Sequence, residues 1–95
     1  MSKKLEEYVK KNNLPEVVEK ALIRWVDEHR GKIGDPAVSG IGVIVDETGR
    51  TSDTRLIKSP NGLAVYYDME TKQQAGAAVY MRKCKAVHVK AYEIM

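Results

Sequence analysis

Apolar positions in the first third of the chain recur at helical spacing. Leu5, Tyr8 and Val9 form a narrow apolar stripe, which predicts a helix over about residues 3–12. A second and wider stripe predicts a helix that ends near residue 30, and its members are Leu14, Val18, Ala21, Leu22, Trp25 and His29. Asn13, followed three residues later by Glu16, is typical of a capping box, so we expect the second helix to begin there.

From residue 40 onward the pattern changes to the alternation that is typical of β-strands. Ile41, Val43 and Val45 alternate with other residues and predict the first strand. Residues 51–53 are expected to be loop. Further strands are expected over residues 55–58, 63–68 and 87–94, with turns at residues 46–50 and 59–62.

Residues 69–85 fit two descriptions. The stretch Ala78–Met81 resembles Ala64–Tyr67, which favours a strand that pairs with it, followed by a bend near residues 83–85. The alternative is a third helix at about residues 69–84, with Glu70 in its first turn and bases in its last. We prefer the strand, because the apolar residues do not gather on one helical face and Gly76 lies inside the segment.

These elements predict an α+β fold, with two N-terminal helices packed on an antiparallel sheet of four to five strands. The length of 95 residues predicts a single domain over residues 1–95, with a helical part at 3–30 and a β-rich part at 40–95. A domain of this size buries a modest core, so we expect a homodimer to add stability.

Composition narrows the class of protein. No apolar run approaches the roughly 20 residues that span a bilayer, and no apolar stretch follows the N-terminal lysines, so neither a membrane protein nor a signal peptide is expected. The single Cys cannot form a disulfide within the chain, which fits the cytoplasm. We expect no cofactor.

The net charge of +3 is unevenly placed, because residues 79–95 carry four bases and one acid. On the expected sheet, bases and tyrosines share the outward face of the last strands. Such a face suits a protein interface, and it also suits single-stranded nucleic acid, whose bases stack on aromatic rings. The expected binding residues are Tyr66, Tyr80, Arg82, Lys83, Lys85, His88, Lys90 and Tyr92.

Sets of catalytic or metal-binding residues are sparse. Asp53 and Glu70 could hold a divalent cation while Lys72 stabilises developing charge, which is the basis for a metal-dependent nuclease hypothesis. Cys84 and His88 are four residues apart, too far along a strand to share a zinc ion, so no metal site is expected.

The sequence therefore favours a small, non-enzymatic binding or regulatory protein that acts through a surface on a macromolecular protein partner, as an inhibitor or accessory factor. Inhibitors and accessory factors of phages and mobile elements share this size and lack of motifs, an analogy of size alone. The first alternative is single-stranded nucleic-acid binding through the Tyr/Arg/Lys sheet face. The second is the nuclease with Asp53, Glu70 and Lys72.

Overall fold

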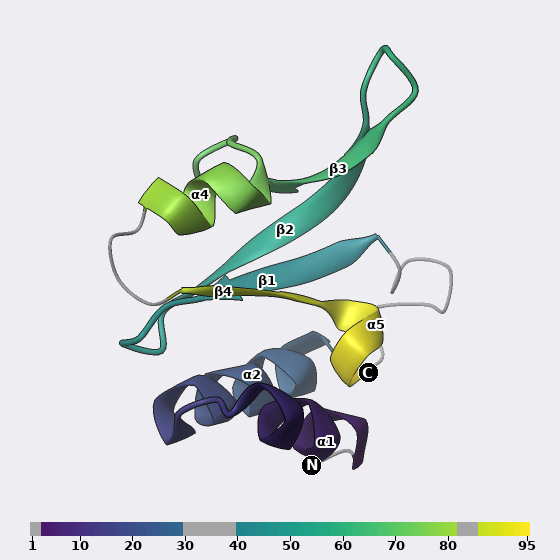
Figure 1. The fold of residues 1–95 in the computed structure, drawn as a ribbon. Helices are drawn as coiled ribbons and strands as arrows, with labels where there is room; N and C mark the ends of the chain where they lie inside the picture. Colours follow the sequence, from purple (N-terminus) through teal and green to yellow (C-terminus); the bar gives the residue numbers. More distant parts are fainter. Residues whose placement is uncertain (1–2, 30–39, 82–85) are drawn as a thin grey trace.

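The computed structural model of the chain describes residues 3–29, 40–81 and 86–95. Within them, helices cover both faces of one antiparallel sheet (Figure 1), so the expected α+β class is confirmed. In chain order the elements are α1 (Lys3–Asn12), α2 (Glu16–His29), β1 (Ile41–Val45), β2 (Thr51–Lys58), β3 (Ala64–Asp68), α4 (Ala75–Met81), β4 (Val87–Lys90) and α5 (Ala91–Ile94).

The strands stand in the order β3-β2-β1-β4, and each neighbouring pair is antiparallel. β1 lies inside the sheet, and residues 42–45 are all buried because helices cover both of its faces. Val43 and Val45 point toward α1, α2 and α5, whereas Ile44 points toward α4. A short apolar run without alternation is the pattern that such a doubly covered strand requires.

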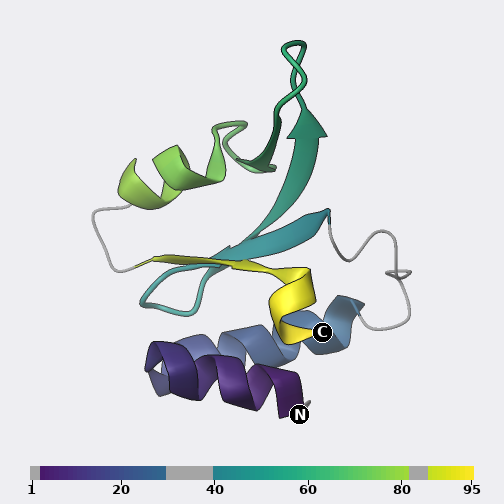
Figure 2. The ribbon, with the colours of Figure 1, turned by 45° about the vertical axis from the view of Figure 1, so that its right-hand side comes forward.

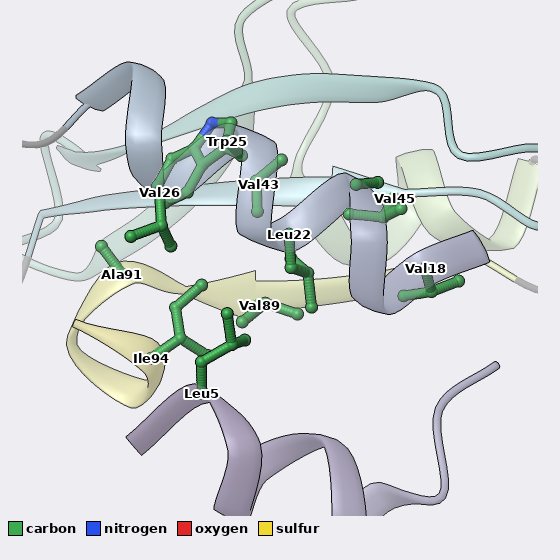
Figure 3. Close-up of a cluster of buried hydrophobic side chains, with 11 residues drawn as sticks. Leu5, Val18, Leu22, Trp25, Val26, Val43, Val45, Val89, Ala91 and Ile94 are labelled. Atoms are coloured by element: carbon green, nitrogen blue, oxygen red, sulfur yellow. The ribbon is translucent and has the colours of Figure 1, made fainter. Parts of the chain in front are cut away.

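The main core lies between α2 and the β1–β4 half of the sheet (Figure 3). The apolar face of α2, with Leu22 and Trp25 at its centre, packs over Val43 and Val89. Leu5 of α1 and Ile94 of α5 close the core at its far side, and both are almost fully buried. The two N-terminal helices thus pack on the sheet as predicted.

The joint between α1 and α2 differs from the expected capping box. Asn13 has a left-handed backbone, with φ of 51°, and its N–H donates to the Lys10 carbonyl. The Leu14 N–H donates to the Val9 carbonyl, which completes a Schellman motif that ends α1. The Pro15 carbonyl instead accepts the first hydrogen bonds of α2. The capping-box prediction was wrong because Asn also favours the left-handed residue that ends a helix.

β2 is longer than the strand beside it, and this creates a projecting arm. Its first residues pair with β1 as far as Arg55 opposite Ile41, so the prediction of a loop at 51–53 was wrong. From Leu56 onward β2 continues to pair with β3 beyond the end of β1. Residues 56–66, here called the arm, therefore stand out from the body of the molecule as a hairpin (Figures 1 and 2).

The preferred strand at residues 69–85 is wrong where the structure describes it, and the alternative of a third helix is closer. α4 covers Ala75–Met81 and buries Ala75 and Ala78 against Ile44. These two small residues are three apart on one side of the helix, and the half-buried Val79 packs beside them. The helix was not preferred because its fully buried face is made of alanine. The bend expected at 83–85 lies outside the described residues.

The last strand is shorter than expected. β4 ends at Lys90, and residues 91–94 turn into the short helix α5, so the strand prediction at 87–94 was wrong in its second half. Ala91 and Ile94 are both buried in the main core, which a helical spacing of three allows. The Lys90 N–H donates to Glu93 Oε1 at 3.1 Å, and this hydrogen bond stabilises the first turn.

Two glycines give a matched test of the sheet. A Cβ on Gly42 would lie 2.6 Å from Thr54 Oγ1 and 2.8 Å from the Val89 carbonyl oxygen, whereas a Cβ on Gly76 of α4 would meet nothing within 4 Å. We expect Gly42→Ala to lower the free energy of unfolding by about 1–3 kcal/mol through overpacking. Gly76→Ala should raise it by about 0.5–1 kcal/mol, because alanine favours a helix. Urea unfolding followed by Trp25 fluorescence measures both, and a neutral Gly42→Ala would contradict the tight contact.

Candidate functional site

The sheet face beneath α4 brings together two of the eight residues expected to bind a partner. The ring centroids of Tyr66 and His88 lie 5.1 Å apart at an interplanar angle of 68°, an edge-to-face contact. Gly42 has no side chain, which leaves room for His88 Nε2 to reach Thr54 Oγ1 at 2.9 Å. Thr54, Tyr66 and His88 therefore form a packed polar cluster above Gly42.

Both rings of this cluster favour their uncharged forms. Burial, and then the positive charge of Lys90, lower the pKa of His88, while the Glu93 carboxylate acts in the opposite direction. Burial, with some nearby negative charge, raises the pKa of Tyr66. Thr54 is fully buried, so its hydroxyl packs against the imidazole and does not face a surface where a substrate could approach. The cluster is arranged for packing.

Two more of the expected binding residues lie near this cluster, because, besides burial, Lys90 contributes to the lowered pKa of His88 and Tyr92 to the raised pKa of Tyr66. Lys90 follows His88 on the same face of β4, and its Nζ lies 3.6 Å from Glu93 Oε1. Tyr92 is part of α5 and Tyr80 is part of α4, where Tyr80 is 85% exposed, so neither stands on the sheet. The prediction that the tyrosines share the outward face of the last strands is wrong for these two, because both lie in helices. The remaining three lie outside the described residues: Arg82, Lys83 and Lys85.

The residues of the nuclease hypothesis make other contacts. Asp53 accepts a hydrogen bond from Trp25 Nε1 at 2.8 Å, and His29 Nε2 lies 3.4 Å from its second oxygen. Glu70 forms an ion pair with Arg50. Among residues 3–29, 40–81 and 86–95, no group of three or more His, Cys, Asp or Glu side chains is placed to hold a metal ion. The Asp53 carboxylate instead connects α2 to β2.

The arm carries apolar side chains that the sequence analysis did not single out. Leu56 is 40% exposed and Ile57 43%, on opposite faces of β2, and Leu63 near the turn is 63% exposed. Two consecutive residues in a strand point to opposite faces, and at this end of β2 both side chains stay partly exposed. Adjacent apolar residues also occur in the buried strand β1, so this pattern in the sequence could not have identified the arm.

A hollow lies on one side of the arm, and we call it the arm pocket. Its volume is about 240 Å³, and its apolar floor comes from β2, the turn of the arm and β3. Lys58 and Lys72 stand at its margin. The apolar side chains of the arm pocket are Ile57, Pro60, Tyr67 and Met69.

Comparison of the chain with models of known protein families, with curated proteins and with solved structures finds no match. In the part of the chain that the structure describes, no helix is both long and apolar enough to cross a bilayer.

The Trp25–Asp53 contact predicts a specific loss of stability. Asp53→Ala removes the acceptor from a buried indole N–H, so we expect the free energy of unfolding to fall by about 1–3 kcal/mol. Asp53→Asn keeps an oxygen acceptor and should cost clearly less. Urea unfolding of the two variants measures the difference, and equal losses would show that the indole hydrogen bond is not the cause.

The lowered pKa of His88 predicts a dependence of stability on pH. The unfolded chain takes up a proton near the ordinary pKa of about 6.5, before the folded chain does, so protonation favours unfolding. The contribution of His88 is therefore complete above about pH 6.5 and is lost as the pH falls from there toward its lowered pKa. The substitution His88→Gln removes this contribution to the pH dependence of stability.

Urea unfolding of the wild type and of His88→Gln at about pH 7.5 and about pH 5 tests the effect. The wild type should lose more stability between the two values than the variant does. Equal losses in both chains would assign the pH dependence to other groups.

Proposed function

We propose that this chain is a small binding protein that acts by occupying a surface of a protein partner, and that the arm is the part that docks. The observation that carries the proposal is the exposure of Leu56, Ile57 and Leu63 on one projecting hairpin. Taking such a side chain from full exposure to full burial contributes about 1.5–3 kcal/mol, so covering these partly exposed side chains contributes a part of that value for each. Clustered exposed apolar residues are typical of interaction sites.

The shape of the arm supports docking over packing within the chain. The arm extends past the end of β1 (Figures 1 and 2). Its Tyr66 packs against the small core under α4, whereas Leu56, Ile57 and Leu63 each stay at least 40% exposed. The bridge between Tyr67 and Gln74 covers part of the outer edge of β3, which limits uncontrolled strand pairing. The arm itself offers the exposed side chains of Leu56, Ile57 and Leu63 to a partner. This arrangement suits an inhibitor or accessory factor.

A binding role is also consistent with the contacts of the polar residues, which bind one another within the chain. Thr54 and His88 pack on one another, and Asp53 is held by Trp25. Single-stranded nucleic acid remains the alternative, and the half-buried Tyr66 beside His88 would be its contact surface. That surface is smaller than the sequence predicted, because α4 covers Ile44 next to it.

The test uses three immobilised chains: the wild type, the double variant Ile57→Lys with Leu63→Lys, and the control Val17→Lys. Val17 is 40% exposed on α2, so it matches the arm residues in exposure and lies elsewhere. We expect a host protein to be retained by the wild type and the control and lost from the double variant. With that protein purified, the double variant should bind at least about tenfold more weakly, or 1.4 kcal/mol.

Three results would overturn the proposal. Equal retention by the double variant would show that the arm does not dock. Retention of nucleic acid in place of protein, with a steep salt dependence, would favour the alternative. A homodimer in sedimentation that dissociates in the Leu63→Lys chain would assign the arm to a second copy of this chain.

A further inference from the structure

The arm pocket lies at the β2–β3 side of the sheet, away from the described helices of this face. There α2 packs on β1, and α5 packs on β1 and β4. The pocket, at about 240 Å³, is bounded mainly by aliphatic groups and one tyrosine ring. A cavity of about 150 Å³ can admit benzene, so this hollow has room for one large apolar side chain.

Two cations line the pocket, and a third lies on the same face of the sheet. Lys58 and Lys72 line it, and Arg55 pairs with Tyr67 across β2 and β3, which places its side chain on the same face of the sheet. None of the three has a carboxylate of the described residues within 4 Å. By contrast, Arg50 pairs with Glu70, so acids in this region are engaged elsewhere. The hollow thus combines an apolar floor with unpaired positive charge.

Hydrogen bonds to Asp68 hold the turn that carries Lys72 in place. Asp68 is fully buried at the end of β3, and its carboxylate accepts hydrogen bonds from the Glu70 N–H and the Thr71 hydroxyl. The Lys72 N–H donates to the Asp68 carbonyl at 2.8 Å, with a left-handed backbone at Lys72. This network fixes the backbone of Lys72 beside the pocket before any ligand arrives.

We propose that the arm pocket binds a peptide segment of the partner in which one large apolar side chain is flanked by acidic residues. The inference rests on the proposed function and names the chemistry of the docked segment. The apolar side chain enters the hollow, and the neighbouring carboxylates meet Arg55, Lys58 and Lys72. Met69 in the floor can adapt to side chains of different shape, because the thioether chain is flexible.

An acidic peptide fits this site better than a nucleic acid does. Single-stranded nucleic acid is held by bases stacked on successive aromatic rings. The arm pocket offers one ring, Tyr67, among the aliphatic side chains of Ile57, Pro60 and Met69. The volume is also below the roughly 300 Å³ at which small-molecule sites usually begin, which favours a single side chain.

The experiment measures fluorescence anisotropy with labelled synthetic peptides. The probe has one leucine between two pairs of aspartates, and the comparison peptides replace the leucine by alanine or the aspartates by lysines. We expect the full-length chain to bind the probe at least about tenfold more tightly than either comparison peptide. The affinity should fall as salt is added, because the charges that meet the aspartates are exposed.

A charge reversal is read together with a measurement of folding. The double variant Lys58→Glu with Lys72→Glu should lose the aspartate peptide and gain the lysine peptide, while its urea unfolding stays that of the wild type, so that loss of the fold is not the cause. Lys20→Glu, on the exposed side of α2, is the matched control and should behave as the wild type. If the double variant keeps the original preference, or if no peptide binds, the proposal fails. It also fails if oligothymidylate binds and the same double variant loses it.

The same variants separate this inference from the proposed function. If the Lys58→Glu with Lys72→Glu chain binds the purified partner as the wild type does, while the arm variant does not, the arm docks without the pocket. The inference is then wrong and the proposed function stands. If neither variant affects the partner, the proposed function itself fails.

Discussion

α2 packs its apolar face on β1, and the width of that contact decides which parts of the sheet are covered. A helix with its side chains is about 10–12 Å across, whereas neighbouring strands lie about 4.8 Å apart. One helix therefore covers about two strands. α1 packs on α5 at the β4 side, so it does not widen the layer toward β3. The described helices of this face therefore pack at the β1–β4 side of the sheet, and the arm and its pocket lie at the other side.

The two faces of the sheet contribute unequally to stability. Among the described residues, the core under α2 holds eleven buried residues, and the core under α4 holds three. Because apolar burial is the main favourable term in folding, the fold depends chiefly on the α2 side. The arm adds little to either core, since its large side chains are half exposed. Substitutions in the arm can therefore change binding while the body of the molecule remains folded.

Much of the fold follows from local pattern, and the errors have identifiable causes. α1, α2 and β1 were predicted because each has an apolar face of large side chains with a clear period. α4 was missed because its buried face consists of Ala75 and Ala78, which give no strong periodic signal. The site was harder to predict. Tyr66 and His88 meet across the space that Gly42 leaves open on the strand between them. The arm projects because β2 is longer than β1, and this difference becomes visible only when the strand pairing is known.

Gly42 has a consequence for how relatives of this chain can vary. The obstacle to any side chain at this position includes the Val89 carbonyl oxygen, a backbone atom that no substitution elsewhere removes. Thr54 and His88, by contrast, meet through side chains and can be exchanged together for another pair of matching size. In related sequences position 42 should therefore stay glycine while positions 54 and 88 covary. That signature would reveal that β2 and β4 flank β1 in an alignment where overall similarity has faded.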